Sequence, residues 1–365
     1  MIVAIDVTTL RGRLSGVGYY TARIVEHLAR EIGGEVSQLV LLSNGPVERP
    51  LPGGARLIRG FRFPIRSVWM QFLLPVLLRK LRPDLVHYTN YLAPAVSSGP
   101  YVVSIHDMSL ARTPEHHTLR KRVLTAGLIP RVARGARLVL TPSDATRRDV
   151  LTHLRLPAER VVSIPYAAAE MFRPVHVRPP YPALDQAYFL FVGTIEPRKN
   201  LVRLMDAFAA FSREVPEVNL VLAGQRGWKC EEIYARAQRA DVAQRVIVLD
   251  YVPEEALPGL YSHALACVYP SLFEGFGFPV VEAMACGTPV LTSNTTSLAE
   301  IGEGAALLVD PLDEHAMTMG LLSLARDADL RADLRERGLA RAASLSWDET
   351  GRRTIAAYRK ALSNC

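Results

Sequence analysis

Short apolar runs alternate with helix-like stretches along this chain, and the pattern occurs as two successive series. The first series of runs lies at residues 2–7, 38–42, 85–88, 101–105, 138–141 and 161–164. The second lies at residues 188–192, 219–223, 246–249, 266–269, 289–292 and 306–309. Helical patterns, such as those at residues 18–30 and 201–213, lie between the runs. Strands that alternate with helices form parallel sheets covered on both faces, so the sequence predicts an α/β protein with two Rossmann-like domains.

A proline-dense stretch at residues 172–184 separates the two series. It contains Pro174, Pro179, Pro180 and Pro182, and such a stretch is typical of a stiff linker. We therefore predict one domain at residues 1–173 and a second at residues 174–346. A final segment, residues 347–365, begins with an amphipathic helical pattern.

The composition favours a folded protein that is neither exported nor embedded in a membrane. The chain has 365 residues, of which 49% are hydrophobic and 22% charged, enough for two domains with substantial cores. The most apolar stretch, residues 68–78, is too short to span a bilayer. No basic, apolar leader precedes the first predicted strand, so we expect a cytoplasmic protein.

The cysteines predict reduced thiols and no zinc site. The four of them, which lack CxxC spacing, are Cys230, Cys267, Cys286 and Cys365. Cys286 is either a reactive thiol or, as we favour, a small buried side chain.

Positive charge is concentrated in the first half of the chain. Residues 1–173 hold 24 Lys and Arg against 12 Asp and Glu, whereas the remainder holds 19 against 24. A basic first domain suits an anionic membrane surface or a phosphate-bearing acceptor, although simple solubility charge is the alternative. Two basic stretches, residues 62–74 and 119–137, fit membrane-surface helices or packed helices with a solvated basic face. No motif or aromatic pattern indicates nucleic acid.

Two glutamates follow the predicted strand at residues 266–269. Glu274 lies in a glycine-punctuated turn, and Glu282 lies near the start of an apolar helical segment. Carboxylates accept hydrogen bonds from sugar or ribose hydroxyls, and the amides at a helix start suit phosphate. This segment therefore predicts a site that holds a nucleotide sugar along much of its length.

Two further turns follow predicted strands and open predicted helices. The turn Gly193-Thr-Ile-Glu-Pro-Arg198-Lys199-Asn200 fits a diphosphate clamp, with an exposed basic turn as the alternative. The loop Gly12-Arg-Leu-Ser-Gly16-Val-Gly18 either lets a ligand approach the backbone or is a structural turn. It is not GxGxxG, and no matched acidic residue follows a second strand, which disfavours a dehydrogenase.

Two other sequence features have a functional and a structural interpretation. His106 follows the strand at residues 101–105, at the sheet edge where ligands bind in open α/β folds, and is either a hydrogen-bond donor or structural. Asp327-Ala-Asp329 matches the metal-binding DxD pair, but it lies in a charged helical pattern. A solvated helix face is therefore favoured over a metal site.

Together these motifs resemble the retaining glycosyltransferases of family GT4, which have the GT-B fold, over essentially the whole chain. The most specific part runs from Pro270 to Pro289 and is followed by Ser293 and by Glu300-Ile-Gly302. The other motifs occur in the order that the family has. The resemblance implies two Rossmann-like domains facing a central cleft, with acceptor on the first and donor on the second. It also implies that residues 347–365 form a helix crossing back to the first domain.

The resemblance implies a role for each candidate residue. Glu274 would bind hydroxyls of the donor sugar and Glu282 those of the ribose, while Arg198 and Lys199 would neutralise the diphosphate. Many relatives carry arginine where this chain has Thr194, so the division of work between the two cations is open. The remaining candidates would lie beside the sugar, the diphosphate or the acceptor: His106, Gly16, Gly18, Gly193, Gly275, Phe276, Gly277 and Phe278.

The implied reaction is transfer of a hexose from a nucleoside-diphosphate sugar with retention, without a metal or other cofactor. The N-terminal run and the turn at residues 193–200 look most like mannosyltransferases of bacterial surface-polysaccharide assembly. This implies GDP-mannose, and a lipid-linked or oligosaccharide acceptor at the inner face of the membrane. The alternatives are a UDP-glucose-dependent glucosyltransferase, a GT-B-fold sugar-nucleotide epimerase and a non-catalytic nucleotide-sugar-binding protein. Glu274 as a covalent nucleophile is the alternative to a hydrogen-bonding role.

Overall fold

The chain forms two compact units. The computed structural model describes residues 1–12, 14, 16–59, 68–97, 99–112, 127–178, 181 and 184–363. Unit 1 comprises residues 1–166 and 346–365, and unit 2 comprises residues 167–345. The sequence placed these divisions at 173/174 and 346/347.

Unit 1 is built on a seven-stranded parallel sheet with the order β3-β2-β1-β4-β5-β6-β7. The strands are β1 (Ile2–Asp6), β2 (Gln38–Ser43), β3 (Arg56–Arg59), β4 (Leu85–Tyr88), β5 (Tyr101–Ser104), β6 (Leu138–Thr141) and β7 (Val161–Ser163). Every residue of β4, β5 and β6 is buried, and so are four of the five residues of β1. Burial of this kind is typical of parallel strands that are covered on both faces.

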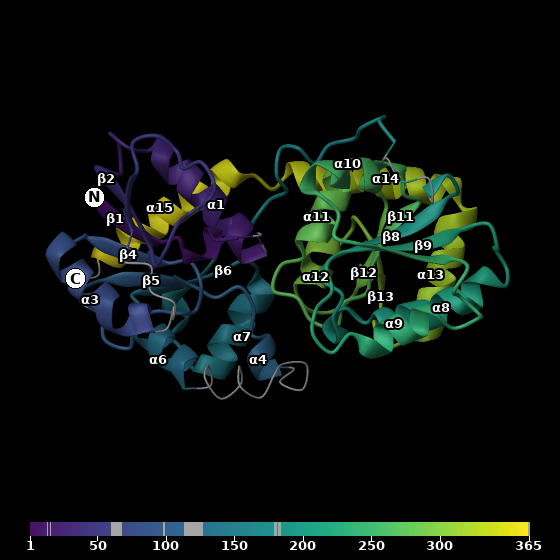
Figure 1. Ribbon diagram of the computed structural model, residues 1–365, viewed down its shortest axis with the longest axis horizontal. Helices are drawn as coiled ribbons and strands as arrows, with labels where there is room; N and C mark the ends of the chain where they lie inside the picture. Colours follow the sequence, from purple (N-terminus) through teal and green to yellow (C-terminus); the bar gives the residue numbers. More distant parts are fainter. Residues whose placement is uncertain are drawn as a thin grey trace. The chain divides into compact units, whose positions relative to one another are not determined.

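Helices cover both faces of this sheet (Figure 1). They are α1 (Gly16–Arg30), α3 (Leu74–Leu81), α4 (Ser109–Arg112), α6 (Leu128–Gly135), α7 (Asp144–Leu154) and α15 (Trp347–Ser363), with short helical turns at Thr8–Leu10, Trp69–Leu73 and Ala158–Arg160. The last helix, α15, packs on α1. Its Tyr358 hydroxyl lies 2.6 Å from Nδ1 of the buried His87 in β4. The C-terminal helix is therefore part of the core of unit 1.

Unit 2 is built on a six-stranded parallel sheet with the order β10-β9-β8-β11-β12-β13. The strands are β8 (Tyr188–Val192), β9 (Asn219–Ala223), β10 (Val246–Asp250), β11 (Ala266–Tyr269), β12 (Val290–Ser293) and β13 (Leu307–Val309). The chain moves outward from β8 to β9 and β10, then returns to the other side of β8 at β11. The carboxyl ends of β8 and β11 therefore form the switch point at which open α/β sheets bind ligands.

The helices of unit 2 form two layers around this sheet (Figure 1). They are α8 (Leu201–Ser212), α9 (Glu231–Ala237), α10 (Leu257–His263), α11 (Phe278–Ala285), α12 (Thr296–Gly302), α13 (Glu314–Arg326) and α14 (Ala328–Ala343), with short turns at Pro197–Lys199 and Glu254–Ala256. Helix α8 packs on α13, and α11 packs on α14. Right-handed crossovers place α8 and α10 on opposite faces, because the chain reverses its direction across the sheet after β10.

The predicted fold class is confirmed, since each unit is a parallel sheet covered by helices. Five of the twelve predicted strands have the observed bounds, namely β4, β6, β8, β9 and β11. The sequence missed β3, a four-residue edge strand with arginine at both ends. Charged ends are common on edge strands because they discourage pairing with another chain, but they hide the apolar run from a hydrophobicity pattern.

Candidate active site

The turns that follow β8 and β11 are joined at the switch point of unit 2. The amide of Leu272 donates to the carbonyl oxygen of Arg198 at 2.9 Å, and the Ser271 hydroxyl oxygen lies 3.1 Å from the same carbonyl oxygen. The backbone of Asn200 adopts the left-handed conformation at φ +62°, and its side-chain amide donates to the carbonyl oxygen of Pro270 at 3.2 Å. The segment with the two cations is thereby fixed against the segment with Glu274.

The loop after β9 supports the first of these turns from its other side. The amide of Ile195 donates to the carbonyl oxygen of Gln225 at 3.0 Å, and the amide of Gly227 donates to that of Ile195 at 3.0 Å. Gly224 has φ +156°, and a Cβ there would lie only 1.8 Å from the carbonyl oxygen of Gly193. Glycine is required at position 224 because the two turns touch through their backbones.

The turn from Glu274 to α11 is fixed by α12. The Ser297 hydroxyl lies 3.0 Å from the carbonyl oxygen of Glu274 and 2.9 Å from that of Phe276. Gly277 precedes α11 at φ +110°, and a Cβ there would lie 2.6 Å from Leu298 Cδ2. Gly275, Phe276 and Gly277 therefore lie at the N-terminus of α11, whose dipole favours negative charge.

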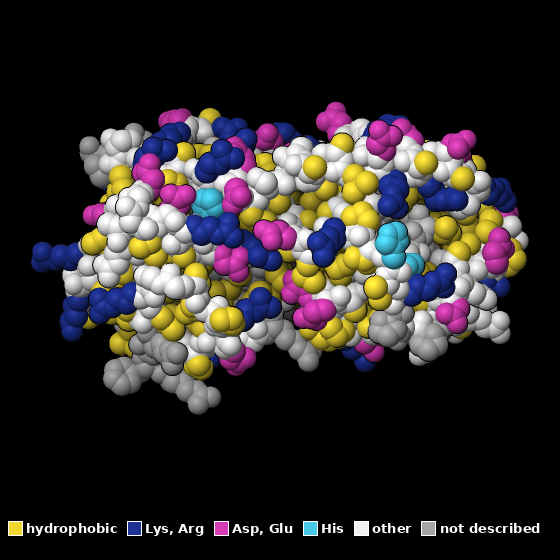
Figure 2. Space-filling model, turned by 90° about the horizontal axis from the view of Figure 1, so that it is seen from above, with side chains coloured by type: hydrophobic (Ala, Val, Ile, Leu, Met, Phe, Trp, Pro, Cys, Tyr) yellow, Lys and Arg dark blue, Asp and Glu magenta, His cyan; other side chains and the backbone are white. Residues whose placement is uncertain are grey.

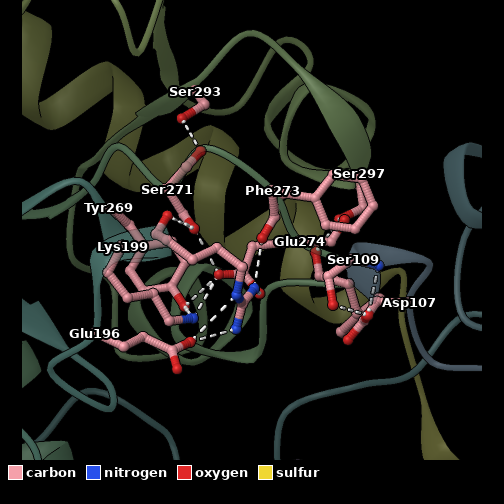
Figure 3. Close-up of polar contacts among 12 residues, drawn as sticks. Asp107, Ser109, Glu196, Lys199, Tyr269, Ser271, Phe273, Glu274, Ser293 and Ser297 are labelled. Carbon is pink, nitrogen blue, oxygen red and sulfur yellow. Dashed lines mark hydrogen bonds and ion pairs between the residues drawn. The ribbon is translucent and has the colours of Figure 1, made fainter. Parts of the chain in front are cut away.

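Glu274 accepts hydrogen bonds from three side chains of unit 2 and forms an ion pair with a fourth (Figure 3). Lys199 Nζ lies 2.5 Å and the Ser271 hydroxyl 2.7 Å from Oε1. The Tyr269 hydroxyl lies 3.1 Å from Oε1, and Arg198 Nη1 lies 2.8 Å from Oε2. The structure thus brings Glu274, Arg198 and Lys199 together, as the resemblance to family GT4 implied.

These contacts keep the Glu274 carboxyl ionised. Burial by itself raises its pKa, but the charges of Arg198 and Lys199 and the hydrogen bonds from Lys199 and Ser271 outweigh burial and lower the pKa to about 2. A carboxylate of this kind is a strong hydrogen-bond acceptor and a poor proton donor at neutral pH. It can therefore accept strong, charge-assisted hydrogen bonds from hydroxyl groups.

Glu196 is a member of this cluster that the sequence reasoning did not select. It is 2% exposed, and its Oε1 lies 2.7 Å from Nη2 and 3.2 Å from Nε of Arg198. Arg198 Nη1 also donates to the carbonyl oxygen of Phe273 at 2.5 Å. The signal in the sequence was a glutamate two residues before the basic pair, a spacing that lets both side chains point to one side of a turn.

Glu282 lies on α11 and has a different environment from Glu274. The Tyr261 hydroxyl donates to its Oε2 at 3.0 Å. Burial raises the pKa of Glu282 to about 7, the nearby Glu254 charge adds to this, and the Tyr261 hydrogen bond acts in the opposite direction. Glu282 therefore exchanges its proton near neutral pH, whereas Glu274 does not.

We expect the Glu282→Gln variant to be more stable than the natural protein at pH 8 but not at pH 5. Because the folded-state pKa of about 7 exceeds the ordinary 4.5, the stability from this group is fully present below pH 4.5 and is lost as pH rises through 7. The gain at pH 8 is about 2 kcal/mol, since Glu282 keeps some exposure. Urea unfolding at both pH values measures it, with Glu303→Gln as an exposed control. An equal effect at both pH values would contradict the raised pKa.

His106 lies in unit 1 just beyond β5, one strand away from the switch point that the carboxyl ends of β1 and β4 form. Its Nε2 lies 2.7 Å from the carbonyl oxygen of Thr89, and its Nδ1 lies 2.9 Å from the Tyr166 hydroxyl. Because a carbonyl only accepts, Nε2 carries the proton and Nδ1 accepts from Tyr166. Burial lowers the pKa of His106, although the Thr89 carbonyl and Asp107 act in the opposite direction. The ring is neutral and both nitrogens are bonded within unit 1, so hydrogen bonding from it to a sugar stays a prediction.

Gly16 and Gly18 do not form a loop, contrary to the prediction. Both lie in the first turn of α1, which begins at Gly16. First-turn amides have no partner within a helix, so glycines there disturb the helix little. Gly18 is needed for close packing, because a Cβ there would lie 2.8 Å from Leu14 Cδ2 and 3.0 Å from the carbonyl oxygen of Thr9. Their contact with phosphate or acceptor stays a prediction.

The remaining predicted features are structural. Asp327 of the DxD pair caps α14 by accepting from the amide of Leu330 at 2.8 Å. Within the described ranges, no group of three or more His, Cys, Asp or Glu side chains is arranged to hold a metal ion. Burial raises the pKa of the Cys286 thiol to about 12, which makes it a filler rather than a nucleophile. Cys365 and the basic residues 62–66 and 119–122 lie outside the described residues.

Comparisons with known proteins find relatives over nearly the whole chain. A family model described as "Glycosyl transferases group 1" matches residues 177–341, and one described as "Glycosyltransferase Family 4" matches residues 14–167. The chain is 32% identical to O-antigen chain mannosyltransferase B of Escherichia coli, over 95% of this chain and 96% of that protein.

The similar solved structures share the fold of the whole chain. Sucrose-phosphate synthase from Thermosynechococcus elongatus has a TM-score of 0.79 at 21% identity, covering 100% of this chain and 99% of that one. The Anabaena protein HepE, solved in complex with UDP and glucose, has a TM-score of 0.77 at 17% identity, covering 98% and 99%.

Proposed function

Because this chain belongs to the family 4, group 1 glycosyltransferases, we propose that its unit 2 binds a nucleoside-diphosphate sugar whose hexose is transferred to an acceptor. The observation that carries this proposal is the ionised Glu274 held by Lys199 and Arg198 at the switch point of unit 2. It combines an acceptor for sugar hydroxyls with two cations for a diphosphate. Glu282, one helical segment further on, is the proposed partner of the ribose hydroxyls.

The arrangement supports transfer without a protein nucleophile. Glu274 is held by hydrogen bonds from Lys199, Tyr269 and Ser271 and by an ion pair with Arg198. These contacts suit hydrogen bonding to the sugar better than covalent attack. Its negative charge also stabilises positive charge that develops on the sugar ring. Arg198, Lys199 and the N-terminus of α11 stabilise the departing diphosphate, so we propose a metal-free reaction with retention at the anomeric carbon.

We propose mannose from GDP-mannose as the donor and a lipid-linked or growing oligosaccharide as the acceptor. The support is the similarity to O-antigen chain mannosyltransferase B, which covers nearly all of both chains. The implied role is bacterial surface-polysaccharide synthesis on the cytoplasmic side of the membrane. None of the helices that the structure describes is both long and apolar enough to cross a membrane.

Peripheral contact with an anionic membrane is part of the proposal. The helical segment before and within α3 exposes Phe72 by 69% and Val76 by 49%, and Arg79 and Lys80 follow on its exposed surface. Apolar side chains next to cations suit the headgroup region of anionic lipid. The face that Figure 2 shows has a mixed surface, with Lys and Arg interspersed among Asp and Glu. Co-sedimentation with phosphatidylglycerol vesicles, against Phe72→Ser, measures this contact.

A donor screen by thermal unfolding tests the proposed function. A ligand that binds only the folded protein stabilises it by mass action. Because GDP-mannose is the proposed donor, it is expected to raise the unfolding midpoint more than UDP-glucose does. At a hundredfold excess over the dissociation constant, the gain is about 2.7 kcal/mol. A larger shift with UDP-glucose would move the proposal to the glucosyl donor. If no nucleotide sugar shifted the midpoint, the proposed donor site would be wrong.

A further inference from the structure

Glu196 is a buried carboxylate in the candidate site for which the proposed reaction has given no role. Its backbone is held from one side by the loop after β9, through the paired amides and carbonyls of Ile195, Gln225 and Gly227. The Cβ atom of Glu196 lies close to Gly227, where an added Cβ would approach it to 3.3 Å. The side chain therefore starts from a fixed backbone and points to the cations.

The two oxygens of Glu196 have different surroundings. Oε1 accepts from both Nη2 and Nε of Arg198, at 2.7 and 3.2 Å. Oε2 is buried, and nothing among the described residues donates a hydrogen bond to it. Leaving a buried carboxylate oxygen without a donor is unfavourable, so the pairing with Arg198 must compensate for it. The position of Glu196 is therefore explained by its pairing with Arg198.

Arg198 lies between two carboxylates and uses a different edge for each. The edge formed by Nε and Nη2 faces Glu196. Nη1 lies 2.8 Å from Glu274 Oε2 and also donates to the carbonyl oxygen of Phe273 at 2.5 Å. Together with Lys199 the cluster has two positive and two negative charges. Because these charges balance, a diphosphate that binds here must compete with the two carboxylates for the cations.

We propose that Glu196 is a positioning residue that holds one edge of Arg198 while the Nη1 edge is exchanged between Glu274 and the donor diphosphate. This inference rests on the proposed function. When Nη1 leaves Glu274, hydroxyls of the donor sugar donate hydrogen bonds to this carboxylate in its place. The planar fork of arginine suits such an exchange, because it presents separate edges to separate partners. Lysine offers a single point charge and cannot hold Glu196 with one edge and the diphosphate with another.

A double-mutant cycle with Glu196→Gln and Arg198→Lys tests this role. Glutamine has the shape of glutamate but removes the charge that fixes Arg198. The kcat of Glu196→Gln is expected to fall on the order of 10- to 100-fold, because a misplaced cation stabilises the leaving diphosphate less. Its KM for the donor is expected to change by less than about threefold, because the lost contribution belongs to the transition state. Adding Glu196→Gln to Arg198→Lys is expected to cause no further loss.

The control is Glu214→Gln, which removes the exposed partner of Arg326 in the same unit and is expected to leave kcat unchanged. Losses that multiply in the double variant would show a structural role for Glu196 and overturn the inference, while the proposed function would stand. A kcat for Glu196→Gln within twofold of the natural protein would overturn it too. Full transfer by both single variants would contradict the proposed function itself.

A second variant keeps the role of Glu196 testable if Glu196→Gln does not fold. Glu196→Asp retains the negative charge and withdraws it from Arg198 by one methylene. It is expected to lower kcat with little change in KM, and the loss is again expected to vanish in the Arg198→Lys background. A loss that persists in that background would overturn the inference.

Discussion

Replacing Glu274 by glutamine is expected to lower the rate of sugar transfer at least about 100-fold while nucleoside diphosphate still binds. In the proposed reaction, this carboxylate accepts hydrogen bonds from the sugar hydroxyls and stabilises the positive charge that develops on the ring. Glutamine is neutral and offers one acceptor oxygen, so the transition state loses more than the ground state. The same change releases Arg198 and Lys199 from their ion pairs with Glu274. Affinity for free diphosphate is therefore expected to rise.

Titration calorimetry with GDP and GDP-mannose, beside a transfer assay, separates the two effects. The natural protein is expected to bind the intact donor better than GDP, because only the donor replaces the cations on Glu274 with hydroxyls. Glu274→Gln is expected to reverse that order. The exposed Glu214→Gln serves as control in both assays. Transfer near the natural rate by Glu274→Gln would remove the assigned role of this carboxylate.

Replacing Lys199 by methionine is expected to destabilise the folded protein by about 3 kcal/mol near pH 7. Lys199 is buried, and its Nζ contacts both Glu274 Oε1 and the Tyr269 hydroxyl. Its loss leaves the ionised Glu274 with Arg198 as its remaining cationic partner. Removing one member of a buried pair is costly because the other charge stays out of water. Urea unfolding measures the loss, with the exposed Lys229→Met as control.

The destabilisation by Lys199→Met is expected to depend on pH. In the natural protein the pKa of Glu274 is lowered to about 2, so its contribution to stability is present above the ordinary 4.5 and is lost as pH falls through 2. The variant raises this pKa, so the difference between the two proteins is full above pH 4.5 and shrinks below it. A loss of the same size near pH 7 and near pH 3 would contradict an electrostatic origin.

Local patterns were sufficient to predict the sheets because most strands are buried on both faces. A run such as β8 is apolar at every position, and Gly193 directly after it marks where it ends. The predicted bounds of α1 were two residues short, because glycine at Gly16 and Gly18 suggests a loop by itself. Packing of α1 against Thr9 and Leu14 decides that case. Such a contact is a tertiary property that residue spacing does not contain.

The site was predicted as an order of motifs, and the structure adds the partners. Glu274 and the basic pair were each predicted to follow a strand, the resemblance implied that they bind one donor, and in the structure they meet. The spacing of Glu196 and Arg198 allowed both side chains to lie on one side of the turn, but it did not show that they pair. It gave no sign that His106 is bonded on both sides by Thr89 and Tyr166. These pairings depend on burial and on the direction of side chains, which are set only when the loops pack together.

The fate of the sugar in labelled GDP-mannose, followed by chromatography with a lipid-linked acceptor present, tests the central claim most directly. The account predicts that the label moves into the acceptor with its anomeric configuration retained and with EDTA having no effect. Label that stayed in the nucleotide sugar as an epimer would identify the epimerase alternative. Label that remained unchanged on the nucleotide in the presence of a range of acceptors would contradict transfer altogether.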